Sequence, residues 1–432
     1  MGKVKYKSIN INSPFLILII TVLFFIISPE IMAKDIKTAR PETVGLSSER
    51  LARLDKVMQA MIDNKKTGGI VLLIARKGKV VHHKAFGFAD IESGTKMTSD
   101  YLFRLWSMTK PITSVALLTL FEQGKFQLTD PLELYIPTFK DVKVFEGFDD
   151  KGNMILAEPR RKITIQDVFR HTAGFSYGDG EGGVDKAYQK AGMDLLKLES
   201  LDELVEKLAK LPLLYHPGEK WVYSLAHDVQ AYLVEYFSGM SFDKYCTEKI
   251  FKPLGMKDTV TGIPPEYASL FPTVYGPDEK GDGIVPIEKP SDSNGYAYFT
   301  KRPFGGHSFS STAMDYYKFG QMLLNGGELS GVRILGKKTV ELMTSNHLPK
   351  EIPENMVGRG MGYGLGVSYL LDMAASGNLG SVGLFGWGGA ATTLVHMDPK
   401  EELVYVFLTQ YMPTDFSVWN SFQTLVYQAI VE

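Results

Sequence analysis

The chain has 432 residues and a formal net charge of −2, and its acidic and basic residues are interspersed along the sequence. Because no basic stripe is present, a nucleic acid is not expected as a partner. Cys246 is the only cysteine, so an intramolecular disulfide is excluded. Hydrophobic residues make up 44% of the chain, and core packing must therefore supply the stability of the fold.

The N-terminus has the three-part pattern of a secretory signal. Three lysines among the first seven residues precede an apolar run from Phe15 to Ile27, and Ile31-Met32-Ala33 offers a cleavage site. The run is shorter than the ~20 residues that a transmembrane helix needs. We therefore predict a signal peptide over residues 1–33 and an exported protein, periplasmic or secreted, without stable membrane insertion after cleavage. An uncleaved signal anchor is the alternative.

A helix and a hairpin are the first elements expected after this segment. Ser47 to Met61 has apolar residues at helical spacing, which predicts an amphipathic helix. Gly69 to Ala75 is continuously apolar, and Lys77-Gly78 separates it from a second run over Val80 to Phe88. This pattern predicts two strands of one sheet. An apolar helix is then expected from Ile112 to Phe121.

The middle of the chain is predicted to be mostly helical, and sheet patterns return toward the C-terminus. Helices are expected over Ile165–Arg170, Leu201–Leu211, Leu225–Phe237 and Thr312–Asn325. Strands are expected over Gly362–Leu371, Ala391–Met397 and Leu403–Thr409, followed by a closing helix over Phe416–Val431.

Strands at both ends of the chain, with helices between them, predict a mixed α/β (α+β) fold. We expect residues 34–125 and 302–432 to form one antiparallel sheet flanked by helices. Residues 126–301 would form a mostly helical inserted part. A cleft is expected at the junction of the two parts.

The most informative motif is Ser107-Met108-Thr109-Lys110, at the start of the apolar helix. Side chains at i and i+3 share a helix face, so the Ser107 hydroxyl and the Lys110 amine can meet. Apolar surroundings disfavour the ammonium form, which would let Lys110 act as a base near neutral pH. The helix N-terminus also points free N–H groups toward a developing anion. The motif therefore predicts an activated serine nucleophile.

Two other segments have the same Ser-X-X-Lys spacing, Ser93–Lys96 and Ser241–Lys244. The first lies in a turn rich in Gly and Thr, and the second begins a short amphipathic helix with a solvated lysine. A capping serine and a surface lysine explain both segments. Ser107 differs because its helix is apolar nearly all round, so a lysine buried there needs a reason.

Two further segments can complete the site. Tyr223 lies at a loop-to-helix junction, and its phenol beside a lysine is a credible proton shuttle. The glycines of Phe385-Gly386-Trp387-Gly388-Gly389-Ala390, directly before the strand at Ala391, allow the backbone to approach a ligand closely. The N–H groups of Ser107 and Ala390 could then form an oxyanion hole. A half-buried tyrosine and a tight turn are the structural alternatives.

Taken together, these motifs make the chain resemble the serine hydrolases of the class C β-lactamase superfamily, and within it the family VIII carboxylesterases. The resemblance covers nearly all of the exported chain. It implies Ser107 as the nucleophile, Lys110 and Tyr223 as an acid–base pair, and Trp387-Gly388-Gly389 as the opposite wall of the site. The segments that carry it are Ser107-Met108-Thr109-Lys110-Pro111, His171-Thr172-Ala173-Gly174-Phe175, Pro217-Gly218 with Tyr223-Ser224, Pro253-Leu254-Gly255-Met256 and Ser311-Thr312-Ala313-Met314-Asp315.

The sequence departs from the β-lactamases of this superfamily at two positions. Their Tyr-X-Asn motif has Leu225 at its third position here, and their Lys-Thr-Gly motif is Trp387-Gly388-Gly389. A neutral indole cannot replace a lysine that helps to hold a substrate carboxylate. The resemblance therefore implies a neutral ester as substrate, bound between aromatic walls from Trp387 and Tyr177.

Other sites are weaker candidates. Gly174-Phe175-Ser176-Tyr177-Gly178 matches a Gly-X-Ser-X-Gly nucleophile elbow, but a helix rather than a strand is expected before Ser176. His171 is expected to have a capping or core role. His82 and His83 are adjacent on a strand, so they face opposite sides and cannot share a metal. No metal site and no cofactor are expected.

The sequence thus predicts a serine hydrolase that cleaves carboxylic esters of short to medium acyl chain through an acyl-enzyme on Ser107. The expected partner is a small-molecule ester or amide. A β-lactamase or a D-amino-acid peptidase of the cell wall is the first alternative, and a non-catalytic binding module of the same fold is the second. The sequence leaves open whether Lys110 or Tyr223 takes the first proton.

Overall fold

The computed structural model describes residues 36–432 except 196, 291, 293–302 and 354–355. The predicted signal peptide, residues 1–33, lies outside the described residues. In the part of the chain that is described, no helix is both long enough and apolar enough to span a membrane.

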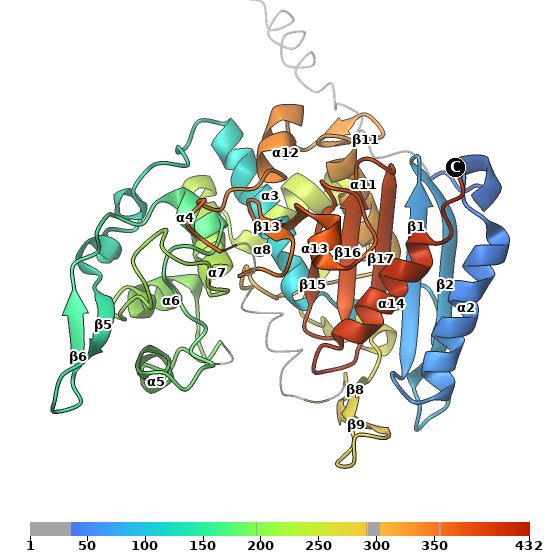
Figure 1. The fold of residues 1–432 in the computed structure, drawn as a ribbon, viewed down its shortest axis with the longest axis horizontal. Helices are drawn as coiled ribbons and strands as arrows, with labels where there is room; N and C mark the ends of the chain where they lie inside the picture. Colours follow the sequence, from blue (N-terminus) through green and yellow to red (C-terminus); the bar gives the residue numbers. More distant parts are fainter. Residues whose placement is uncertain (1–35, 196, 291, 293–302, 354–355) are drawn as a thin grey trace, which may run out of the picture.

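An antiparallel sheet forms the central layer, and its strands come from both ends of the chain (Figure 1). The strand order is β13-β14-β15-β16-β17-β1-β2-β3. The C-terminal β17 pairs along its length with the N-terminal β1, with Ile70 opposite Thr409 and Arg76 opposite Leu403. The fold class predicted from the sequence is confirmed. The strands are β1 (Gly69–Arg76), β2 (Lys79–Asp90), β3 (Thr95–Lys96), β13 (Met361–Tyr363), β14 (Ser368–Leu370), β15 (Phe385–Gly389), β16 (Thr393–Asp398) and β17 (Leu403–Thr409).

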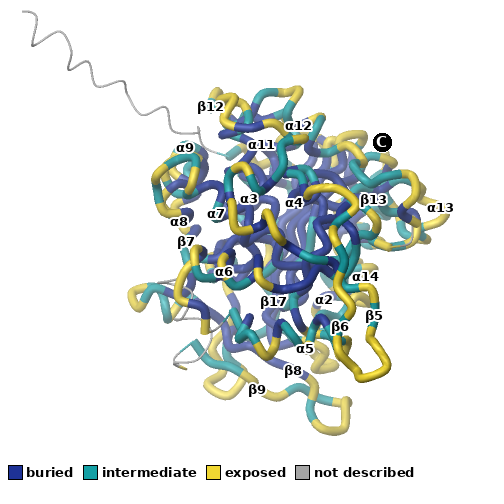
Figure 2. The backbone as a smooth tube through the Cα atoms, turned by 90° about the vertical axis from the view of Figure 1, so that its left-hand side faces the viewer, coloured by how far each residue is buried: buried dark blue, intermediate teal, exposed yellow. Residues whose placement is uncertain are grey.

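Helices cover both faces of the sheet. On one face lie α2 (Ser48–Asp63) and α14 (Phe416–Tyr427), and on the other lie α3 (Thr109–Glu122) and α11 (Ala313–Leu324). Alternate side chains of β1 enter the two cores, so the whole strand is buried. This explains its continuous apolar run, since a strand covered on both faces has no polar side. The buried strands occupy the centre of the molecule in Figure 2.

Shorter helices and small sheets form the part of the chain between α3 and α11. Most of this part lies on the left of Figure 1, whereas its hairpin over residues 274–288 lies below the central sheet. Two hairpins interrupt the helices of this part, so it is less purely helical than predicted. The division of the chain near residues 125 and 302 stays a prediction. The helices are α4 (Ile165–Phe169), α5 (Gly183–Lys190), α6 (Leu201–Leu208), α7 (Ala226–Ser238), α8 (Phe242–Cys246) and α9 (Lys252–Leu254), and the hairpins are β5 (Val144–Phe148) with β6 (Met154–Ala157) and β8 (Val274–Pro277) with β9 (Ile284–Glu288).

The remaining elements are short. A π-helical turn over Thr247–Phe251 joins α8 to α9. A small sheet with the order β4-β10-β7 lies beside the serine motif. Its strands and the other short elements are β4 (Phe103–Arg104), β7 (Val260–Thr261), β10 (Phe309–Ser311), β11 (Glu328–Leu329), β12 (Val332–Arg333), α12 (Lys337–Met343) and α13 (Met373–Ser376).

Several predicted elements have ends other than those expected. The strand expected over Gly362–Leu371 is instead two strands, β13 and β14, because the chain reverses between them. The closing helix ends at Tyr427 rather than Val431, and the helix from Leu201 ends at Leu208. The reversal between β13 and β14 is a local turn, in which Gly364 donates its N–H to the Val367 carbonyl oxygen at 2.8 Å and Gly366 has a φ of 88°. These two glycines are the turn signal that the apolar pattern concealed.

The glycine-rich segment Phe385-Gly386-Trp387-Gly388-Gly389 precedes a strand, β16, as expected, but a strand within the segment itself was not predicted. The segment is itself strand β15, which pairs over its whole length with β16. Glycine has a low strand propensity. The strand conformation is therefore imposed by the neighbouring β16 rather than by local sequence.

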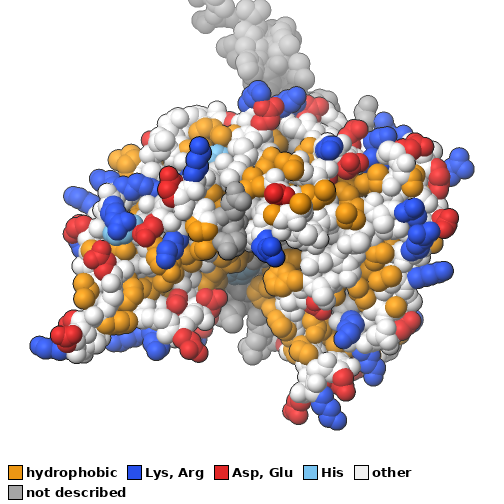
Figure 3. Space-filling model, in the orientation of Figure 1, with side chains coloured by type: hydrophobic (Ala, Val, Ile, Leu, Met, Phe, Trp, Pro, Cys, Tyr) orange, Lys and Arg blue, Asp and Glu red, His pale blue; other side chains and the backbone are white. Residues whose placement is uncertain are grey.

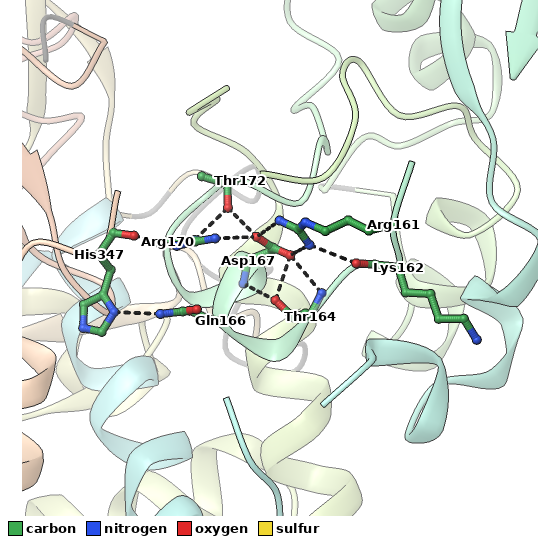
Figure 4. Close-up of polar contacts among 8 residues, drawn as sticks. All are labelled: Arg161, Lys162, Thr164, Gln166, Asp167, Arg170, Thr172 and His347. Carbon is green, nitrogen blue, oxygen red and sulfur yellow. Dashed lines mark hydrogen bonds and ion pairs between the residues drawn. The ribbon is translucent and has the colours of Figure 1, made fainter. Parts of the chain in front are cut away.

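A buried carboxylate joins the helical part to the edge of the sheet. Asp167 accepts hydrogen bonds from both terminal nitrogens of Arg161, at 2.5 and 2.9 Å, and from Arg170 at 3.0 Å (Figure 4). Arg170 also donates to the carbonyl oxygen of His347, just before β13 in the chain, at 2.6 Å. Although burial opposes it, the combined effect of Arg161, Thr164 and Arg170 lowers the pKa of Asp167 to about 2.

We expect Asp167→Asn to lower the free energy of unfolding by about 2 kcal/mol at pH 7, because a lowered pKa is stabilisation of the ionised folded form. This contribution is fully present above the unfolded pKa near 4 and is lost as the pH falls through about 2. Urea unfolding of the variant and its parent measures the difference. Asp150→Asn, at an exposed turn, is the control. An unfolding free energy equal to the parent's at pH 7 would contradict this.

Candidate active site

Ser107 lies in a tight turn whose backbone is strained. A 3₁₀ turn over Trp106–Met108 precedes α3, so the serine lies just before the α-helix rather than inside it. Trp106 has a φ of 49°, a left-handed conformation that costs a bulky residue of the order of 1 kcal/mol or more. The turn is held by the Tyr316 hydroxyl, which donates to the carbonyl oxygen of Met108 at 2.6 Å. This conformation was not predictable from the sequence.

Lys110 is buried beside the serine, with 1% of its surface exposed. Its Nζ atom donates to Ser107 Oγ at 3.1 Å and to the carbonyl oxygen of Gly306 at 2.9 Å. The amine also lies over the ring of Tyr223, 4.6 Å from its centroid. A buried lysine at this position can exchange a proton with the serine hydroxyl.

Tyr223, in the loop before α7, also contacts Ser107 Oγ. Its hydroxyl donates to Ser107 Oγ at 2.6 Å, and the Trp387 indole donates to the Tyr223 oxygen at 3.4 Å. The loop before α7 is held by the segment that follows Asp167, since Val222 donates its N–H to the carbonyl oxygen of His171 at 2.9 Å. The structure thus brings together the three side chains that the sequence predicts as catalytic.

Asp228 is a fourth polar side chain of this group that the sequence reasoning missed. It is fully buried in the first turn of α7 and accepts the Gly306 N–H at 2.9 Å, while the Gly306 carbonyl binds Lys110. The backbone of Gly306 therefore links the Asp228 carboxylate, through its N–H, to the Lys110 amine, through its carbonyl oxygen. Asp228 Oδ2 has no hydrogen-bond partner among the described residues. Burial raises the pKa of Asp228 to about 6, against the opposing effect of Lys110.

The backbone of β15 approaches the serine turn closely. A Cβ atom on Gly389 would lie only 2.3 Å from the carbonyl oxygen of Leu105, so no larger residue fits without a shift of the strand or the turn. Ala390 follows directly, and its carbonyl oxygen accepts a hydrogen bond from Thr414 at 2.9 Å. Both Ala390 and Ser107 line one cavity. This placement is compatible with the predicted oxyanion hole.

The cavity has a volume of about 520 Å³, which is in the usual range for small-molecule sites. Ser107, Tyr223, Trp387, Gly388 and Gly389 are among its lining residues. None of its described lining residues is Asp, Glu, Lys or Arg. In Figure 3, hydrophobic side chains border the hollow between the two halves of the molecule.

Tyr177 and the rival residues lie elsewhere. Tyr177 packs against Tyr223, with ring centroids 5.4 Å apart, and does not line this cavity. Ser176 is buried, and its hydroxyl donates to Asp185 at 2.5 Å with no histidine or lysine bound to it. His171 is buried against the Tyr223 ring, and burial lowers its pKa well below the usual value. Ser176 and His171 therefore have the geometry of structural rather than catalytic residues.

No group of three potential ligands that could hold a metal ion occurs among the residues that the structure describes.

We expect Asp228→Asn to lower kcat/KM about tenfold at pH 7.5, because it removes the buried negative charge that faces the Lys110 amine across Gly306 and so alters the electrostatics of proton transfer at Ser107. In the parent, kcat/KM should fall as the pH drops through about 6, where Asp228 becomes protonated. The buried histidines near Lys110 titrate below their usual range and do not mask this step: His171, His227 and His307. Measurement of kcat/KM from pH 5 to 9 in the parent and the variant tests this prediction. If kcat/KM of Asp228→Asn still falls near pH 6 as in the parent, Asp228 is not the group responsible.

Comparison with known proteins agrees with this geometry. A profile of the beta-lactamase family matches residues 54–428. Esterase EstB of Burkholderia gladioli is 31% identical over 361 residues, which cover 81% of this chain and 88% of that protein. A putative D-alanyl-D-alanine carboxypeptidase of Salmonella typhimurium is 30% identical over 395 residues, covering 86% of this chain and 85% of that protein.

Solved structures agree as well. The structure of EstCE1, described as a hydrolase with promiscuous acyltransferase activity, matches with a TM-score of 0.74 and 26% identity, covering 88% of this chain and 98% of that one. The resemblance to class C β-lactamases and family VIII carboxylesterases is confirmed. The chain belongs to the beta-lactamase family and is a serine hydrolase.

Proposed function

We propose that the protein hydrolyses carboxylic esters through an acyl-enzyme on Ser107, with Lys110 and Tyr223 as its acid–base pair. The observation that carries the proposal is the convergence of the Lys110 amine and the Tyr223 phenol on one serine oxygen, at 3.1 and 2.6 Å. A nucleophile needs a base within hydrogen-bond reach, and two candidates meet that condition here.

The reaction would proceed in two halves. Tyr223, with Lys110, takes the proton of Ser107 while the serine oxygen forms a bond to the ester carbonyl carbon. The N–H groups of Ser107 and Ala390 stabilise the resulting oxyanion. The proton then passes to the departing alcohol oxygen as its bond to carbon breaks. Water attacks the acyl-enzyme by the same route, with Tyr223 as base, and releases the acid.

The uncharged wall of the cavity favours a neutral ester. Trp387 occupies the position where the related β-lactamases have a lysine that holds a substrate carboxylate, and its indole supplies no cation. The resemblance to EstB and EstCE1, named as an esterase and a hydrolase, supports the same substrate class. Tyr177 would act behind Tyr223, restricting the movement of its ring.

A cell-wall peptidase is the second candidate, because one relative is named as a putative D-alanyl-D-alanine carboxypeptidase. Peptides of that kind end in a free carboxylate, which needs a cation or several donors for binding. The described cavity wall offers no Lys or Arg. The ester is therefore the better candidate. Export through the N-terminal segment stays part of the proposal.

We expect Ser107→Ala to lower the hydrolysis of p-nitrophenyl butyrate at least about a thousandfold, because it removes the only nucleophile that both bases reach. Ser176→Ala is the matched control and should retain turnover, since its hydroxyl donates to Asp185 and accepts the Gly178 N–H, and neither contact involves Ser107. Nitrocefin and a peptide ending in D-Ala-D-Ala should be turned over far more slowly than the ester.

Mass spectrometry of the parent with the ester should detect an acyl group on Ser107. Full activity of Ser107→Ala, or loss of activity in Ser176→Ala alone, would contradict the nucleophile assignment. Faster turnover of the peptide than of the ester would favour the peptidase instead.

A further inference from the structure

The cavity at Ser107 continues well beyond the reacting atoms. One end is formed by Ser107, Tyr223 and Trp387, and the other lies between α14 and the strands β14–β16. The residues of this second end, which we call the α14 groove, are Leu370, Leu384, Leu394, Phe416, Trp419 and Asn420. Its position on the α14 face follows from Leu394, which belongs to the core under α14.

Two features of β15 shape the wall between the α14 groove and the nucleophile. Strand β14 pairs only with Phe385 and Gly386, so the edge of β15 from Trp387 onward has no partner in β14. The Trp419 ring of α14 packs directly against Gly388, where a Cβ atom would lie 2.1 Å from it, so the absence of a side chain lets Trp419 line the same cavity as Ser107. The serine and the α14 groove therefore line one continuous space.

The lining of the α14 groove is mostly apolar and carries no charge, and Asn420 is the one polar member among the residues that define it. Its leucines, Phe416 and Trp419 supply most of the wall, and His396 beside them is held neutral because burial lowers its pKa to about 4. Phe416 is 65% exposed at the start of α14, and its ring packs edge-on against that of Trp419, with centroids 5.1 Å apart. A volume of about 520 Å³ far exceeds what an acetyl or butyryl group fills.

We propose that the α14 groove binds an extended alkyl chain of the substrate, so that the preferred esters are lipid-like rather than short. This inference rests on the proposed esterase function and adds its substrate class. The hydrophobic effect supplies the binding: each methylene group buried in the groove contributes up to about a fourfold gain in kcat/KM.

The experiment compares p-nitrophenyl acetate, butyrate, octanoate and decanoate, and separately ethyl acetate and octyl acetate. The first series lengthens the acyl chain and the second lengthens the alcohol. Asn420→Trp fills the α14 groove with a large ring from an exposed position on α14. Ser421→Trp is the matched control, because the neighbouring residue is also exposed and does not line the cavity.

The proposal expects kcat/KM to rise with chain length in one of the two series, and that series identifies which side of the ester enters the groove. Asn420→Trp should lower kcat/KM for the long ester at least about tenfold and change the acetate value much less. Ser421→Trp should leave both values at those of the parent.

Two results would overturn the proposal: flat chain-length dependence in both series, or an Asn420→Trp variant that affects short and long esters equally. The same assays distinguish a failure of this proposal from a failure of the proposed esterase function. Hydrolysis of the acetate that Ser107→Ala abolishes supports the esterase whatever the chain-length result is. If neither series is hydrolysed at all, the esterase itself fails.

Discussion

The burial of one amine is the constraint on which the site depends. Lys110 projects from an apolar helix with 1% of its surface exposed, and an ammonium in such a place needs compensating groups on every side. The Gly306 carbonyl, the Tyr223 ring face and the Asp228 carboxylate provide them. These groups come from two segments that are far from α3 in sequence, residues 223–228 and Gly306, so correct placement of Lys110 requires both of them to pack against α3.

Two sets of contacts hold this packing arrangement in place. The Asp167 network holds the loop that presents Tyr223, and through His347 it also reaches the edge of the sheet (Figure 4). From the opposite side, β15 packs against the serine turn at Gly389. The Asp167 network therefore positions Tyr223, and the contact with β15 positions the turn of Ser107. The distances to Ser107 Oγ depend on both contacts rather than on any single element.

Elements whose pattern is local were predictable. The N-terminal hairpin has two apolar runs and a Lys77-Gly78 turn, and β17 covers the residues expected for it. Features that arise from tertiary structure were not. The strained Trp106 has no sequence signature, and a glycine-rich segment such as β15 becomes a strand only because β16 lies beside it. Asp228 was missed because an acidic residue in the first turn of a helix usually serves the helix dipole.

The pairing of β1 with β17 has a consequence for the order in which the chain can fold. Thr409 and Gly69, which share a hydrogen bond at 2.7 Å, are 340 positions apart in sequence. Non-local pairings of this kind form late, because chain entropy opposes them until both partners exist. A growing polypeptide therefore carries β1 as an unpaired edge strand until its last segment is synthesised. Because such an edge is a template for aggregation, the nascent chain depends on whatever shields β1 during that interval.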